Sequence, residues 1–160
     1  MSVNKYMPHV LVLPEDDANR QLANGFLLDI STRQVQVLVE VGGWVQVRDR
    51  FASDHVSGMR KYTDRFMVLL IDFDGHVNRL KTMRDSIPED LLDRVFILGT
   101  SSEPEALRQA GLGTYETIGM GMADDCRHGT RTMWAHNLLC HNDAELARLQ
   151  TAACGVFFGS

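Results

Sequence analysis

The sequence predicts an α/β protein whose central, mostly parallel sheet of four or five strands lies between two layers of helices, as a three-layer sandwich. Short apolar runs alternate with amphipathic helical patterns over the first two-thirds of the chain. These runs are continuously apolar, which indicates strands buried on both faces. The chain has 160 residues, of which 44% are apolar, so we expect one domain with a sizeable core. Its α/β core would span 8–119, and C-terminal helices would occupy 120–160.

The expected elements follow in order along the chain. HVLVL predicts a first buried strand, and the spacing of Leu22, Phe26 and Ile30 predicts the next helix, with Asp16 or Asp17 as its N-cap. QVQVLVEV alternates as a strand does, and RFMVLLIDFDG is the longest apolar run. The expected order is strand 9–13, helix 16–30, strand 34–41, helix 44–64 with a break near Gly58, strand 65–75, helix 77–87, strand 94–99, helix 103–111 and a candidate fifth strand at 114–119.

The C-terminal part of the chain has a different character. Residues 120–130 read as a loop, and the stretches 132–140 and 143–153 have helical patterns. Asn142 and Glu145 have the spacing of an N-cap and the third helical residue, which predicts a capping box. We expect these helices to cover the sheet or to contact a partner.

Composition limits the classes of function. The formal net charge of −5 counts against a protein that binds nucleic acid through its own surface alone. A metal-dependent enzyme remains compatible, because bound divalent ions offset local acidic charge. No apolar stretch is long enough to span a membrane, and the N-terminus lacks the pattern of a signal peptide. Three cysteines fit reduced thiols, so we expect a cytoplasmic protein.

Carboxylates follow the first and third expected strands: Glu15, Asp16 and Asp17, then Asp72 and Asp74. Ligands of parallel sheets bind beyond the carboxyl ends of the strands, where these acids should meet. Residues i and i+2 of an extended chain point to the same side, so the acids at 72 and 74 could share one ion. Oxygen ligands suit Mg²⁺ or Mn²⁺. A competing interpretation makes Asp74 and Asp16 or Asp17 helix caps and leaves Asp72 as a solvated strand end.

The spacing of these acids resembles the TOPRIM domain of topoisomerases, primases and OLD-family nucleases. The matching residues are Glu15 in VLVLPEDD and Asp72 and Asp74 in LLIDFDG, and the resemblance covers about residues 8–119. It implies a sheet of about four parallel strands, a glutamate acting as general acid/base, and aspartates that hold Mg²⁺ for chemistry on nucleic-acid phosphodiesters. Asp16 replaces the glycine that usually follows the glutamate.

Three further features bear on the TOPRIM hypothesis, and the first of them is implied by the resemblance. OLD-like members often carry another acidic motif after the fourth strand, which Glu103 or Glu105 in SSEPEAL could supply, although helix capping explains these glutamates equally well. The acidic net charge suggests a nuclease subunit that takes its DNA affinity from a protein partner, for example an ATPase. A cluster at Arg79, Lys81 and Arg84 would contact phosphates, or it forms an ordinary solvated helix face.

A second resemblance is to response-regulator receiver domains. It rests on HVLVLPEDDANRQL and on GTSSEPEALRQAGLGTY. It implies Asp72 as phosphoacceptor, Asp16 and Asp17 as Mg²⁺ ligands, and Thr100 as the switch residue of a signalling module. The lysine of the family's fifth strand is missing from TYETIGMGMADD.

Two alternatives remain open. The chain could be a degenerate scaffold whose C-terminal helices bind a protein partner. Cysteines and histidines of the C-terminal part could bind zinc, although their spacing matches no standard finger, and packing or surface roles are the competing explanation. This group comprises Cys126, His128, His136, Cys140 and His141.

Overall fold

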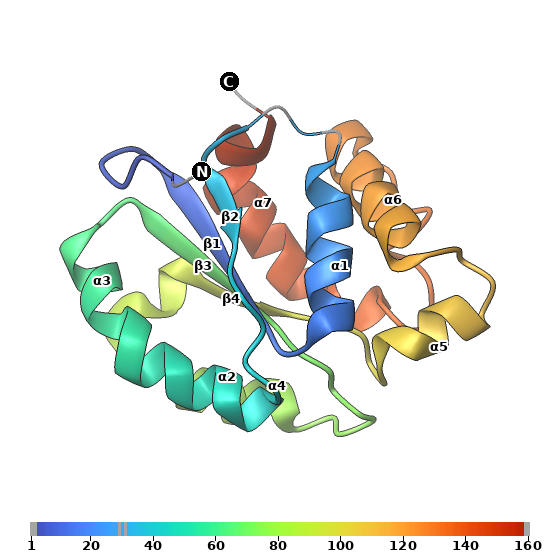
Figure 1. Cartoon of the computed structure of the whole chain (residues 1–160), viewed down its shortest axis with the longest axis horizontal. Coiled ribbons are helices and arrows are strands. Elements are labelled where there is room, and N and C mark those ends of the chain that lie inside the picture. Colours follow the sequence, from blue (N-terminus) through green and yellow to red (C-terminus); the bar gives the residue numbers. More distant parts are fainter. Residues whose placement is uncertain (1–2, 29, 31, 159–160) are drawn as a thin grey trace.

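The computed structural model describes residues 3–28, 30 and 32–158, which form a parallel sheet between two layers of helices (Figure 1). The strands are β1 (His9–Pro14), β2 (Val35–Val37), β3 (Arg65–Leu70) and β4 (Val95–Leu98). Their order is β2-β1-β3-β4, and every neighbouring pair is parallel. The predicted fold class is therefore confirmed, with four strands in the described part of the chain.

The helices divide between the two faces of the sheet (Figure 1). One side carries α1 (Asp17–Leu27), α5 (Pro104–Gln109), α6 (Tyr115–His128) and α7 (Asp143–Phe158). The other side carries α2 (Trp44–Arg50), α3 (Val56–Lys61) and α4 (Arg79–Asp85), with a 3₁₀ segment at Glu89–Arg94. No described helix has the length and apolarity needed to cross a membrane.

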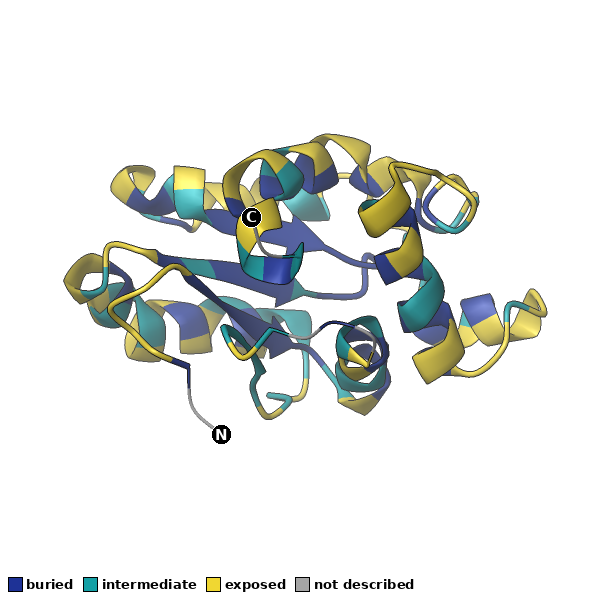
Figure 2. Cartoon of the chain, turned by 90° about the horizontal axis from the view of Figure 1, so that it is seen from above, coloured by how far each residue is buried: buried dark blue, intermediate teal, exposed yellow. Residues whose placement is uncertain are grey.

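Strands β1 and β4 are buried on both faces and β3 is largely buried, as their continuous apolar sequences predict, whereas the edge strand β2 is half-buried (Figure 2). Successive side chains of a strand point to opposite faces. Val10 and Val12 of β1 accordingly pack with α1, α6 and α7 in one apolar cluster, whereas Leu11 and Leu13 pack with α2, α3 and α4 in the other. Each helical layer thus has its own core on one shared sheet.

Two elements of the first half differ from the prediction. The second strand ends at Val37, and Val39, expected on its buried face, is 73% exposed. Leu38 still bonds to Val12 of β1 through its backbone N–H, but the chain then turns at Gly42. The break in the expected 44–64 helix is a π-helical turn at Phe51–His55, within which Phe51 is buried, and the helix continues through Gly58 to Lys61.

The candidate fifth strand at 114–119 is wrong, and so is the loop at 120–130, because both belong to α6. The Thr114 hydroxyl accepts a hydrogen bond from the Thr117 N–H and caps this helix. Tyr115, Ile118 and Met122 are buried at helical spacing. Helix spacing of these apolar residues therefore prevails over the strand-like composition.

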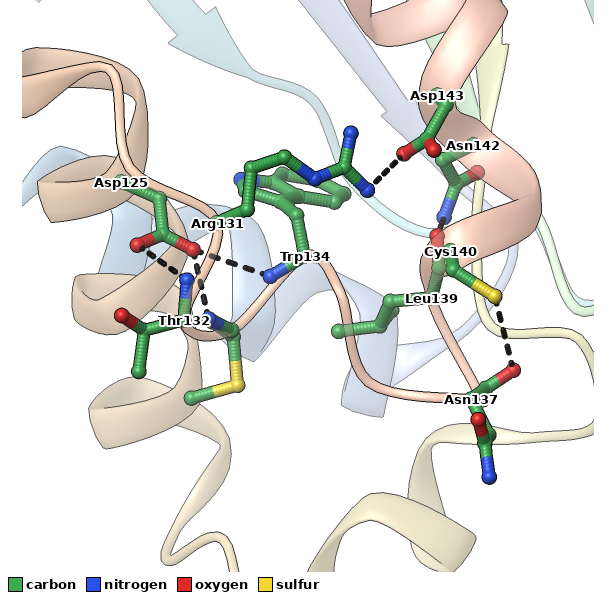
Figure 3. Close-up of polar contacts among 10 residues, drawn as sticks. Asp125, Arg131, Thr132, Trp134, Asn137, Leu139, Cys140, Asn142 and Asp143 are labelled. Carbon is green, nitrogen blue, oxygen red and sulfur yellow. Dashed lines mark hydrogen bonds and ion pairs between the residues drawn. The ribbon is translucent and has the colours of Figure 1, made fainter.

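The expected helix at 132–140 is also wrong, since the chain there runs in turns around the carboxylate of Asp125 (Figure 3). Asp125 lies at the end of α6 and is only 3% exposed. Its two oxygens accept hydrogen bonds from the Thr130 hydroxyl and from the backbone N–H groups of Thr132, Met133 and Trp134. A helix starting at residue 132 would leave the N–H groups of its first turn without backbone acceptors. In the turns observed here, the Asp125 carboxylate accepts from three of these N–H groups.

The expected capping box at the start of α7 is wrong, because its polar side chains bond to the outer edge of β4 instead. Asn142 accepts from the Gly99 N–H at 3.1 Å and donates to the Gly99 carbonyl at 2.9 Å. Glu145 accepts from the Ile97 N–H, and Arg148 donates to the Val95 carbonyl. One helix face thus satisfies alternate backbone groups of the strand, in the position where a fifth strand would have paired.

Candidate acidic site

The carboxylates of the first and third strands meet at the carboxyl end of the sheet, as their positions in the sequence predict. Glu15 directly follows β1, and its Oε2 accepts a 2.6 Å hydrogen bond from the backbone N–H of Asp72, beyond the end of β3. Both side chains are buried, at 8% and 7% exposure. Asp72 is therefore not the solvated strand end of the capping interpretation.

Asn19 is a site residue that sequence reasoning missed. It is fully buried, and its amide nitrogen donates both to Asp72 Oδ1, at 2.7 Å, and to Asp16 Oδ1, at 3.0 Å. The same Asp16 oxygen accepts from the Asn19 backbone N–H and caps α1, as predicted for Asp16 or Asp17. The only signal in the sequence is that a polar side chain falls on the buried side of a helix, three residues after its cap.

Burial dominates the electrostatics of the two deeply placed acids. The pKa of Asp72 is raised to about 8, chiefly by burial and in part by the nearby Asp16 and Glu15 charges, against the hydrogen bond from Asn19, which lowers it. Burial also raises the pKa of Glu15, with contributions from Asp16 and Asp74, while the Asp72 N–H bond and Arg79 act in the opposite direction. The site consequently favours a proton or a cation near these carboxylates.

Asp74 does not join Asp72 on one side of an extended chain. Its φ is 49°, a left-handed value that is uncommon for a residue other than glycine. Its Oδ2 accepts a 2.6 Å bond from Arg79, which also donates to the Asp72 carbonyl at 2.8 Å and lies over the Trp44 ring. Asp74 does not cap α4 either, because that helix begins at Arg79 and follows Asn78.

The remaining predicted acids lie apart from this contact. Asp17 is exposed and bonds to Arg20 and Gln21 on its own helix, and these hydrogen bonds lower its pKa. Glu103 and Glu105 are exposed at the start of α5, just after Ser102, whose carbonyl accepts from the Asp74 N–H.

The proposed phosphate-binding cations all have acidic partners. Arg79 bonds to Asp74, and its side chain is only 10% exposed. Lys81 and Arg84 pair with Asp85 and Glu145, at 2.6 Å and 3.4 Å. Of these three, Lys81 is the most exposed, so its pairing costs least to break in order to reach a phosphate.

Several oxygen atoms near this end of the sheet have hydrogen-bonding capacity left over. Oδ1 of Asn19, Oγ1 of Thr100 and Oγ of Ser102 are buried and bond to no described protein group. Across residues 3–28, 30 and 32–158, no three His, Cys, Asp or Glu side chains are arranged to hold a metal ion together. Mg²⁺ needs only one or two carboxylates, with carbonyl, amide or water oxygens completing its shell. The donor set around Asp72 fits this requirement.

The cysteines and histidines of the C-terminal part do not form a zinc cluster within the described residues. Cys126 is half-buried at the end of α6, whereas Cys140 is exposed and its thiol lies near the Asn137 carbonyl (Figure 3). His141 packs edge-on against Phe73, with ring centroids 4.9 Å apart. Phe73 separates Asp72 from Asp74, so this contact supports the acidic loop.

Comparison of the chain with protein-family models, with curated proteins and with solved structures found no match. The site therefore has to be interpreted from its own chemistry.

Proposed function

We propose that this protein is a Mg²⁺- or Mn²⁺-dependent, TOPRIM-like enzyme, or enzyme subunit, that acts on nucleic-acid phosphodiester bonds. The observation that carries the proposal is the contact between Glu15 and Asp72 at the carboxyl end of the sheet. This contact joins Glu15, whose carboxyl is suited to proton transfer, to Asp72, whose carboxylate is suited to holding a cation. Phosphodiester chemistry needs both, because charge must be neutralised while a proton moves.

In this proposal each residue of the site has a separate task. Asp72 would hold the cation, which would neutralise phosphate charge when bound, whereas Asp74 is paired with Arg79 and would have to leave it to reach the same ion. Glu15 moves the proton, and its raised pKa brings it closer to the operating pH of a general acid/base. Asn19 positions Asp72 and Asp16 through its two amide hydrogen bonds. Because the chain is acidic, nucleic-acid affinity would come from a protein partner, such as an ATPase.

Calorimetric titration with Mn²⁺ and Mg²⁺, followed by plasmid cleavage with and without a candidate ATPase partner, tests this function. We expect Asp72→Asn to weaken metal binding at least tenfold. Glu15→Gln should keep most of the binding and lose about 10²- to 10⁴-fold in cleavage rate. Asp17→Asn is the matched control, since its carboxylate bonds only within α1, and both properties should be unchanged. A wild-type protein that binds neither ion would contradict the proposal.

A receiver-like signalling module is the second candidate. The bridge from Asp16 through Asn19 to Asp72 favours it, because a phosphoacceptor aspartate needs acidic neighbours that recruit Mg²⁺. The described residues provide no fifth strand to carry the lysine that the resemblance requires. If the protein is a receiver-like module, incubation with acetyl phosphate and Mg²⁺ should add one phosphoryl group to the wild type and none to Asp72→Asn, as measured by mass spectrometry. An unmodified wild type would exclude this candidate.

A further inference from the structure

An apolar cavity of about 450 Å³ lies between the sheet and the layer of α1, α6 and α7. Its floor includes Val12, Val68 and Leu98 of three neighbouring strands, and Leu149 of α7 lies on its wall. The site residues Glu15, Asp16, Asn19 and Asp72 are not among those that line it. The cavity is therefore separate from the acidic site.

Half of the residues that line this cavity are buried, and the others form a wide opening to solvent, so it is a deep pocket rather than a closed void. Val68, Leu98, Trp134 and Leu149 are each less than 10% exposed. The exposed lining residues are Gly129, at the end of α6, and Thr151 and Cys154 on α7. These three mark the mouth.

Leaving this apolar cavity empty, or filling it with ordered water, is unfavourable. Apolar side chains that line an empty pocket lack contacts on one side, and this loss grows with the size of the pocket. An ordered water needs two to four polar partners. Among the described residues that line the cavity none carries a charge, and the polar side chains are Cys126, Gln150, Thr151 and Cys154, on one side of the cavity.

We propose that the cavity binds an uncharged, predominantly apolar small molecule, which enters between Gly129 and the Thr151–Cys154 turn of α7. Its apolar body would pack against the sheet and Trp134, and a single neutral polar group would face Gln150 or Thr151. The volume lies within the range of small-molecule sites, which enclose most of their ligand in apolar walls.

The cysteines provide a test that needs no substitution. Cys126 and Cys154 line the cavity, whereas Cys140 is exposed and does not line it. The probe is a series of linear 1-alkanols from butanol to decanol, and a small thiol reagent reports the modification rate at each cysteine by peptide mass spectrometry. We expect saturable protection of the two lining thiols and none at Cys140. The alkanol affinity should rise about fourfold per methylene until the cavity is full, then level off.

A filled-cavity variant provides the matched control. Leu149→Trp should abolish the protection, whereas Leu80→Trp, on α4 at the opposite face of the sheet, should keep it. Circular dichroism checks that both variants fold. If Leu149→Trp does not fold, the protection pattern of the wild-type cysteines tests the proposal by itself. Equal protection of all three cysteines, or protection of none, would overturn the proposal.

Discussion

Asp72 is the residue at which burial and charge oppose each other most strongly. Its ordinary pKa of 3.8 rises to about 8 in the folded protein, chiefly because the carboxyl is buried. Between these two pH values the folded state holds a proton that the unfolded state has released. Stability of the metal-free protein therefore falls as pH rises from about 4 to about 8.

Replacing this carboxyl with an amide should accordingly stabilise the metal-free protein while removing the proposed cation ligand. We expect Asp72→Asn to raise the free energy of unfolding at pH 8 by roughly 1–2 kcal/mol, because no charge has to be buried. The gain should disappear at pH 4. Urea denaturation at the two pH values measures it, and a variant less stable than the wild type at pH 8 would show that the Asp72 charge is well solvated or paired.

Asp125 is the opposite case, an acid whose charge the fold supports. Burial alone would raise its pKa, but the bonds from the Thr130 hydroxyl and from three backbone N–H groups lower it. Its stabilisation is thus present above the unfolded-state pKa of 3.8 and is lost as pH falls through the lower folded value.

We predict that Asp125→Ala costs about 2–4 kcal/mol at pH 7, because it leaves several buried N–H groups without an acceptor. The difference from wild type should shrink as the pH falls below about 4. Thermal unfolding across pH 3–7 measures both effects. Asp124→Ala is the control, since Asp124 is exposed on the preceding helical position. A pH-independent difference would indicate that the cost comes from packing rather than from the charge.

At the scale of elements, α1 and α6 approach closely because glycines lie between them. A Cβ added at Gly25 would overlap backbone atoms of Glu116, and one at Gly119 would overlap the Leu22 carbonyl and the Phe26 nitrogen. Gly119 belongs to a GxG stretch that could suggest a nucleotide-binding loop. The structure gives it a packing role instead.

Gly25→Ala and Gly119→Ala should each destabilise the protein by roughly 1–3 kcal/mol, because the helices must move apart. Gly155→Ala on α7 is the matched control, since a Cβ there meets no atom within 4 Å. It should be neutral or stabilising by up to about 1 kcal/mol through helix propensity. Chemical denaturation compares the three variants. Equal effects at all three sites would show that propensity, and not the close approach, governs them.

At the scale of the whole molecule, the C-terminal helices are part of the core. Leu146, Leu149 and Phe157 of α7 pack in the same apolar cluster as Val10 and Val68 of the sheet. Asn142, just before α7, and Glu145 and Arg148 on α7 bond to backbone groups of Gly99 and of the outer edge of β4. Without these contacts part of one sheet face and one sheet edge would be exposed together.

We therefore expect a fragment of residues 1–119 not to fold cooperatively, although it contains all four strands. Its far-ultraviolet spectrum should keep some helical signal, whereas its thermal transition should be broad or missing. Adding a peptide of residues 120–160 should restore a cooperative transition. A fragment that unfolds sharply by itself would show that the C-terminal part is a separable extension.

The sequence by itself determined the layered α/β class and the meeting of Glu15 with Asp72. Both follow from local patterns, since continuous apolar runs are buried on two faces and the ends of parallel strands share one edge. Tertiary structure decided the rest. Helix α6 replaces the expected strand, Asn142 and Glu145 bond to β4 instead of capping α7, and Asp74 turns to Arg79. These outcomes depend on partners distant in sequence, and a buried polar group bonds to whichever partner the packing brings within reach.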